Sequence, residues 1–272
     1  MSKGIGRITL TVIMSLVLVG MLFPLIYMFV VSLKTSNIFG DITAMLSASF
    51  SLKNYIQIFS RGVITRFVFN SVLVAIVVTM GNIIFCSMTG YALARKKFFG
   101  NRFLFISATA VLMIPQHVVI IPVYILISKL GMHNTYWALI LPWLVNPLGV
   151  FLMRQYISNL PDDCEQSARI DGAGEFTILF KIVMPMCKPA LAVLAVQVFL
   201  TNWNSFLYPF ILTSSPKLYT LPVGLSMMQG LQQMDIGQLM AGSTIAALPV
   251  IIVFLFFQRQ ITEGITAGAL RG

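Results

Sequence analysis

The sequence PDDCEQSARIDGAGEFTILFKIVMP occupies residues 161–185 and forms a polar island in an otherwise apolar chain. The 272 residues contain 8 acidic side chains. Five of them lie in this stretch: Asp162, Asp163, Glu165, Asp171 and Glu175. An apolar chain that concentrates its carboxylates in one short segment presents that segment to something soluble.

The stretch has the signals of a helix, a turn and a second helix. Pro161 followed by two carboxylates is typical of a helix start, because acidic side chains complement the positive end of the helix dipole. We expect a first helix from about Cys164 to Ile170 and a turn at Gly172–Gly174, because glycine permits a positive φ. A second helix should begin near Glu175. Its apolar residues have the spacing of one helix face: Phe176, Leu179, Phe180 and Val183.

The composition excludes an ordinary soluble domain. The chain is 58% hydrophobic and 10% charged, with a mean hydropathy of +0.90, whereas soluble domains are about one quarter charged. We expect an all-α, polytopic membrane protein. The length suits a single membrane domain of roughly five to seven helices, at about 20 apolar residues per crossing.

Six apolar stretches predict six membrane spans: residues 8–33, 67–94, 103–128, 136–157, 189–212 and 241–257. A signal peptide is the alternative for the first, but the run is too long and lacks a clean cleavage site. Pro115 and Pro122 interrupt the third span, which neighbouring helices can compensate. We expect outer segments at residues 34–66, partly helical near Leu52–Phe59, and at residues 213–238.

The net charge of +10 could indicate nucleic acid, but a topological explanation is better because cytoplasmic loops collect Lys and Arg. The densest basic cluster, Arg95–Lys97 with Arg102, comes after the second span. Of the 18 Lys and Arg residues, 12 fall in segments predicted to be cytoplasmic. We therefore expect both termini and residues 161–185 in the cytoplasm, and no nucleic-acid partner.

Residues 161–185 resemble the EAA loop of ATP-binding-cassette importer permeases. That pattern is Glu-Ala-Ala, three residues, Gly, nine residues, Ile, one residue and Leu-Pro. Here Gln166-Ser167-Ala168 stand at the first three positions, and Gly172, Ile182 and Met184-Pro185 at the others. Gln and Ser depart from the pattern, and Glu165, one position earlier, supplies the missing charge. The alternative is an interfacial amphipathic hairpin without a partner.

The resemblance implies that this loop forms a coupling helix, which docks into a groove on a separate cytoplasmic ATPase. The coupling residues that it implies are Glu165, Gln166, Ser167, Ala168, Asp171, Gly172, Ala173, Ile182 and Pro185. ATP and Mg²⁺ would then be bound by the ATPase, and this chain would hold no cofactor of its own.

A second resemblance concerns carbohydrate importers. Residues Asn202–Pro209 resemble their Trp-Asn-x-Phe-x-x-Pro segment, and Tyr219–Leu225 resemble the Thr-Leu-Pro-x-Gly-Leu that comes after it; Asn70-Ser71 and Ile170–Ala173 also match. This resemblance implies the second, six-helix permease of a maltose-type or related importer in a bacterial plasma membrane, which moves an oligosaccharide, a monosaccharide or a glycerol phosphate by alternating access. It also implies a partner permease, a pair of ATPases and an external solute-binding protein.

Sugars bind to aromatic faces and to amides, and four neighbouring residues offer both: Asn202, Trp203, Asn204 and Tyr208. We predict that they line the substrate path. The alternative is that the amides bond between helices while Trp203 lies at the membrane interface. The same two alternatives apply to other polar residues of the spans: Asn82, Gln116, His117 and Asn146.

Two other classes of function fit the sequence less well. A self-sufficient ion-coupled carrier usually keeps a carboxylate within the membrane, and all acidic residues here fall in predicted loops. An enzyme would need a catalytic or phosphate-binding motif, and none of the common ones occurs. The cysteines, Cys86, Cys164 and Cys187, lack metal-ligand spacing, so we expect free thiols and no metal site.

Overall fold

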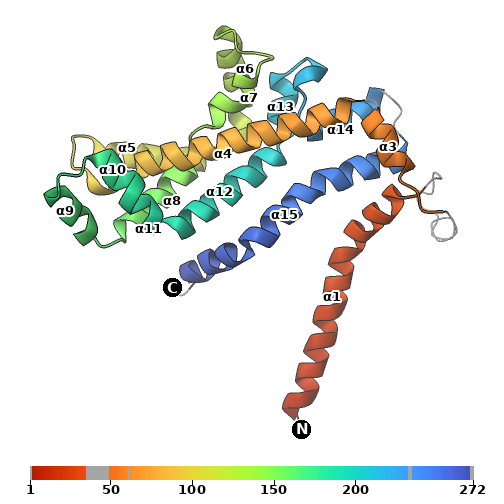
Figure 1. Ribbon diagram of the computed structural model, residues 1–272, viewed down its shortest axis with the longest axis horizontal. Helices are drawn as coiled ribbons and strands as arrows, with labels where there is room; N and C mark the ends of the chain where they lie inside the picture. The colour runs from red at the N-terminus through yellow and green to blue at the C-terminus, as the bar shows by residue number, and fades with distance from the viewer. Residues whose placement is uncertain (1, 35–48, 61, 232–234, 270–272) are drawn as a thin grey trace. The chain divides into compact units, whose positions relative to one another are not determined.

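The computed structural model describes residues 2–34, 49–60, 62–231 and 235–269 (Figure 1). Residues 35–48, which belong to the outer segment expected at residues 34–66, lie outside the described residues. These residues form two compact units, 1–66 with 224–249 and 67–223 with 250–272. In chain order the helices are α1 (Ser2–Ser32), α3 (Lys53–Ser60), α4 (Val63–Arg95), α5 (Asn101–Ala110), α6 (Ile120–Lys129), α7 (Tyr136–Ile140), α8 (Pro147–Ser158), α9 (Asp163–Ile170), α10 (Glu175–Ile178), α11 (Met184–Met186), α12 (Lys188–Trp203), α13 (Leu207–Leu212), α14 (Leu221–Leu231) and α15 (Ile236–Ala269). The expected all-α class is confirmed.

Four helical segments of the described chain are long and apolar enough to cross a membrane, and two bent helix pairs bring the number to as many as six. The four are Thr9–Ser32, Val63–Arg95, Tyr136–Ser158 and Ile236–Gln258. The bent pairs are Asn101–Met113 with Gln116–Lys129, at 97°, and Glu175–Met186 with Lys188–Trp203, at 85°. The several apolar helices match the expected polytopic membrane protein.

The break in the third expected span lies at Pro115. A proline pushes the residue before it out of the helical region, and Ile114 is extended, with φ −87° and ψ 119°. The predicted interruption at Pro115 is therefore confirmed. Pro122 does not interrupt the chain, because it is the third residue of α6, where a missing N–H costs no helical hydrogen bond.

The fifth expected span is not one continuous helix. Within the expected span at residues 189–212, α12 ends at Trp203 and α13 begins at Leu207. Pro209 gives the physical reason, because its ring would clash with the carbonyl of Ser205 in a continuous helix. The chain leaves the helix just before that point and resumes it afterwards.

Two further boundaries differ from the expected ones. Residues 213–238 are not a plain loop, since they contain α14. The last helix, α15, continues to Ala269 instead of ending at residue 257. The expected helix near Leu52–Phe59 is confirmed by α3.

In the first unit, Asn54 of α3 caps the end of α1. Its Nδ2 donates to the carbonyl oxygens of Ser32 (2.9 Å) and Lys34 (2.8 Å), and Asn54 is buried. These are carbonyls that the end of a helix leaves without partners. A Cβ on Gly237 would lie 2.6 Å from Asn54 Nδ2, so the start of α15 approaches α3 at a residue with no side chain.

In the second unit, α8 packs between α4 and α12 through small residues. A Cβ on Gly90 would lie 2.7 Å from Met153 Cβ, and one on Gly149 would lie 2.8 Å from Leu194 Cδ1. Such close approach is typical of helix packing in membranes, where small residues bring backbones together. Met153 and Leu194 are buried. Residues 161–185 pack against the core that these three helices form.

Candidate functional site

The polar stretch folds as a helix, a tight turn and a second helical segment. α9 confirms the first predicted helix, and Gly172 has φ +81°, as expected of the turn. The amide of Gly172 donates to Arg169 O (3.1 Å) and that of Ala173 to Ala168 O (2.9 Å). These two bonds form a Schellman motif with Gly172 at its left-handed position. The turn therefore ends α9 at a fixed place.

The second segment differs from the expected amphipathic helix. After the short α10, residues Leu179–Val183 form a π-helical turn, which adds one residue to the turn and rotates the face that the next residues present. Phe176 and Phe180 are exposed, whereas Ile178 takes a buried place with Leu179 and Val183. The predicted apolar face is therefore correct for Leu179 and Val183 and wrong for the two phenylalanines.

A buried ion pair joins α9 to the end of α4. The carboxylate of Glu165 is 2% exposed, and its Oε1 accepts a hydrogen bond of 2.8 Å from Arg95 Nε, whose side chain is 14% exposed. Arg95 Nη2 also donates to Leu160 O at 2.8 Å. The second oxygen, Oε2, lies 3.6 Å from Arg169 Nη2. Glu165, which the sequence analysis named as the charge missing from the EAA pattern, is thus directed into its own chain.

A second acidic residue, Glu175, is held at the same place. It accepts a 2.8 Å hydrogen bond from Tyr91 Oη, pairs with Lys96 Nζ and lies 3.4 Å from Arg169 Nε. Hydrogen bonds from Lys96, Tyr91 and Arg169 outweigh partial burial and lower the pKa of Glu175 to about 2. Glu175 is therefore a carboxylate at neutral pH.

We call these side chains the anchor cluster. Its members are Tyr91, Arg95, Lys96, Glu165, Arg169 and Glu175. Figure 1 shows α9 and α10 beside the end of α4, where the cluster lies. Sequence reasoning missed the pairing, although the basic run after the second span and the acids of the polar stretch were both recognised. The opposite charges of these two segments could have indicated that they pair.

The remaining residues of the EAA-like pattern divide into two groups. Gln166, Ser167, Asp171, Gly172 and Pro185 are exposed. Ala168, Ala173 and Ile182 are partly buried against the core of the second unit. Ile170 is 86% exposed, although it is apolar. The outer face of α9 therefore presents small, polar and apolar groups together, while its inner face is fixed by the anchor cluster.

A cavity of about 340 Å³ lies in the second unit at the break of the third expected span. Its polar and aromatic lining residues are Asn82, Gln116, Trp143, Asn146, Thr201, Asn202 and Tyr208. Trp143 and Tyr208 meet edge to face with centroids 4.5 Å apart, and Tyr208 Oη donates to the carbonyl of Gln116.

The structure brings two of the four predicted path residues to this cavity. Asn202 and Tyr208 line it, whereas Trp203 and Asn204 do not. Trp203 is buried and stacks on Phe199, with centroids 5.9 Å apart. Asn204 is exposed, and its Nδ2 donates to Leu200 O at 2.9 Å. Trp143, which the sequence analysis did not single out, supplies the aromatic ring instead.

The sequence and the fold are both similar to those of known transport proteins. The sequence profile of the family described as "Binding-protein-dependent transport system inner membrane component" matches residues 87–266. The arabinooligosaccharides transport system permease protein AraQ of Halalkalibacterium halodurans is 38% identical, over 92% of this chain and 91% of the relative. AraQ of Bacillus subtilis is 36% identical, over 99% and 97%.

A solved structure has the same fold. It is that of a bacterial ABC transporter involved in the import of the acidic polysaccharide alginate, and it superposes with a TM-score of 0.84 at 21% identity, covering 95% of this chain and 97% of that one. Together with the family profile, the match confirms the fold class. The chain belongs to the family of inner-membrane components of binding-protein-dependent transport systems, and it is a multi-pass permease of the ATP-binding-cassette importer type, not an enzyme.

Proposed function

We propose that this permease forms part of the path by which a sugar enters the cell. The relatives named above are arabinooligosaccharide permeases, and the cavity beside Tyr208 has the groups that sugars need. Trp143 and Tyr208 offer aromatic rings. Among the described residues, neither Asn146 Nδ2 nor Asn202 Oδ1 has a hydrogen-bond partner. One can donate to a hydroxyl and the other can accept from one.

The break in the third span adds a second reason to place the substrate there. Transporters of other folds bind substrates where membrane helices are interrupted, because the freed backbone groups then line a cavity. Here the chain bends by 97° at Pro115, and Gln116, just beyond the bend, lines the cavity. The hydrogen bond from Tyr208 to Gln116 O ties the bend to α13.

The free energy for transport would come from ATP hydrolysis by partner ATPases, and α9 would transmit their movement to this chain. The exposed face of α9 would dock in a groove on an ATPase, with Ile170 and Gln166 at the contact. Closure of the ATPases on ATP and Mg²⁺ would then push α9, and the anchor cluster would pass the movement to α4. The observation that carries this proposal is the buried Glu165–Arg95 ion pair. Because this pair connects α9 directly to the end of α4, the two helices should move together.

The proposal implies a complete importer. It would contain this chain, a second permease, two ATPases and an external solute-binding protein. The termini and residues 161–185 would lie in the cytoplasm with the ATPases. A structural neighbour of the same fold, with a TM-score of 0.59, was solved in complex with an alginate-bound periplasmic protein, which is consistent with such a binding partner.

A native cysteine allows a direct test of ATPase docking. Cys164 lies on α9 and is exposed, whereas Cys86 and Cys187 are buried. Membranes that contain the whole transport system are treated with a short thiol-to-amine cross-linker, and the product is identified by mass spectrometry. We expect one product, in which Cys164 is joined to an ATPase subunit, and its yield should change when ATP is added.

The control is Cys164→Ser, which removes the exposed thiol and should abolish the product. The permease should also co-purify with a second permease and two copies of an ATPase. Two results together would contradict the proposal. Cys164 would form no cross-link to an ATPase, and the permease would transport sugar as a single chain or as a homodimer. Those results would favour a self-sufficient carrier or channel for a small polar solute.

The cavity proposal predicts a difference between two neighbouring asparagines. Asn202→Leu should raise the sugar concentration for half-maximal uptake by roughly threefold to tenfold, since it removes one hydrogen bond to the substrate. Asn204→Leu is the matched control, because each Nδ2 bonds a carbonyl of its own helix but only Asn202 lines the cavity. Uptake of labelled sugar by cells measures both. Equal effects of the two variants would contradict a substrate role for this cavity.

A further inference from the structure

The connection between α4 and α5 combines basic side chains with exposed aromatic rings. We call residues 96–103 the basic–aromatic turn. Phe99 is fully exposed, Phe103 is 72% exposed and Phe98 is 42% exposed. Lys97 and Arg102 are exposed as well. Several exposed phenylalanine side chains in one segment, together with exposed basic residues, are unusual on a surface that contacts only water.

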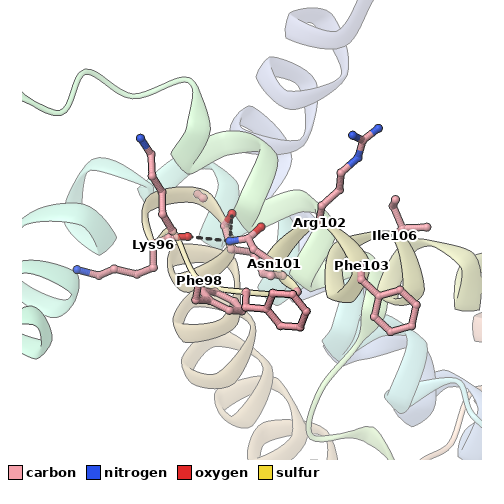
Figure 2. A pocket seen from close by; sticks show the side chains of 11 residues that line it. Lys96, Phe98, Asn101, Arg102, Phe103 and Ile106 are labelled. Carbon is pink, nitrogen blue, oxygen red and sulfur yellow. Dashed lines mark hydrogen bonds between the residues drawn. The ribbon is translucent and has the colours of Figure 1, made fainter.

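The backbone of this turn is held in one shape. Asn101 Nδ2 donates to the carbonyls of Lys96 (2.8 Å) and Leu93 (3.3 Å), as the dashed lines in Figure 2 show. Gly100 has φ +87°, which favours glycine. The turn encloses a shallow hollow of about 880 Å³, lined by its basic and aromatic residues. It is therefore a preformed surface.

Arg102 points away from two of the aromatic rings of the turn. Figure 2 shows the guanidinium of Arg102 and the ring of Phe103 extending to opposite sides of α5, with the ring of Phe98 on the side of Phe103. Lys96 is engaged by Glu175. Within the described part of the chain, neither Lys97 nor Arg102 has an ion-pair partner. Both side chains are therefore available to bind a negatively charged group.

An apolar groove continues from the turn along the neighbouring helices. It has a volume of about 570 Å³, shares Leu93 and Phe98 with the hollow, and runs between α4, α5 and α8. Its lining is apolar except for Thr89: Met88, Ala92, Leu93, Phe98, Leu104, Ala108, Val145, Pro147 and Val150. The basic hollow and the apolar groove next to it are therefore complementary to the two parts of an anionic phospholipid, its charged headgroup and its acyl chain.

We propose that the basic–aromatic turn binds an anionic phospholipid. Its headgroup would lie against Lys97 and Arg102, and an acyl chain would occupy the groove that begins at Phe98. The turn lies at the end of α4, a membrane span, where such a molecule is present at high concentration. Basic residues next to a membrane helix attract anionic lipids, and aromatic side chains favour the depth of the headgroups. This binding does not depend on the transported substrate or on the ATPases.

The test places a reporter on the turn. Phe99→Trp puts an indole at a fully exposed position, so the substitution should not disturb packing. The full-length chain, with the subunits that co-purify, is reconstituted into nanodiscs that contain brominated phosphatidylglycerol or brominated phosphatidylcholine. Bromine quenches indole fluorescence only at contact. Subtracting the signal of the parent protein removes the contribution of its 3 native tryptophans.

We expect brominated phosphatidylglycerol to quench the reporter at a lipid fraction about tenfold lower than phosphatidylcholine, given two cations near an anionic headgroup. Adding Lys97→Gln and Arg102→Gln to the reporter protein should bring this ratio close to one. Lys129→Gln is the matched control: Lys129 is an exposed cation at the end of α6, away from the turn. It should leave the ratio unchanged.

Three results would overturn the proposal. Equal quenching by the two lipids would show that the turn is only immersed in the bilayer. Absence of quenching by either lipid would show that another subunit covers Phe99. Loss of the lipid preference on adding millimolar inorganic phosphate would show a site for a free anion instead of a lipid.

Discussion

Glu165→Ala is expected to destabilise the permease and to abolish coupled transport. The substitution leaves Arg95 largely buried without its partner, and breaking a buried ion pair from one side costs roughly 3–5 kcal/mol. α9 would lose its tie to α4, so ATP hydrolysis by the partner subunits should continue while sugar uptake falls at least about tenfold. The ratio of sugar transported to ATP hydrolysed, measured in proteoliposomes, reports this loss directly.

Two further variants separate a coupling role from simple misfolding. In Glu165→Ala with Arg95→Ala, no buried charge is left unpaired, so thermal stability in detergent should partly recover. Transport should not recover, because the tie between α9 and α4 is still missing. Asp163→Ala changes an exposed carboxylate of the same helix and should alter stability by no more than about 0.5 kcal/mol. Uptake that tracks stability across all three variants would contradict a coupling role for the pair.

The features that could be predicted from sequence are those that depend on local backbone rules. Gly172 was expected at a turn because glycine permits a positive φ, and its φ is +81°. Pro115 was expected to interrupt a span, and Ile114 before it is extended. The EAA-like pattern identified the family, because it fixes residue types over about twenty positions of one continuous segment.

The features that could not be predicted depend on contacts between distant residues. Glu165 was expected to supply the charge missing from the EAA pattern, but its pairing with Arg95, 70 positions away in the chain, could not be predicted. Trp203 was expected on the substrate path, yet it packs on Phe199, and Trp143 occupies the cavity instead. Aromatic and amide side chains look alike in a sequence whether they bind substrate or a neighbouring helix, so only the fold distinguishes them.

The π-helical turn is a third kind of difference. Leu179–Val183 has the composition of an ordinary amphipathic helix, and an extra residue in a helical turn leaves no mark in the spacing of side chains. Within this turn, Phe180 is exposed and Val183 is buried. The turn connects α10, which bears Glu175 of the anchor cluster, to α11. We therefore attribute the failed prediction at Phe180 to this turn.

Gly172→Pro is expected to abolish transport by a different route, since it removes the turn after α9. Proline fixes φ near −65°, whereas Gly172 has φ +81°. It also removes the amide that donates to Arg169 O. The turn would then have to adopt another conformation, at a cost of more than about 1 kcal/mol, and Arg169 would leave Glu165 and Glu175. Sugar uptake should fall to background, and in cross-linking the product between Cys164 and the ATPase should be lost as well.

Two controls make this prediction specific to the left-handed turn. Gly172→Asn keeps the amide and places there the residue that tolerates positive φ best after glycine, so most of the uptake should remain. Gly174→Ala changes a glycine two positions away whose φ is −73° and whose Cβ would meet nothing within 4 Å; it should behave as the parent protein does. If Gly172→Pro still transports sugar, α9 does not need a fixed end, and the rigid connection from the ATPase contact through α9 to α4 is wrong. If Gly174→Ala loses transport equally, the loop requires flexibility at both glycines instead of one defined conformation at Gly172.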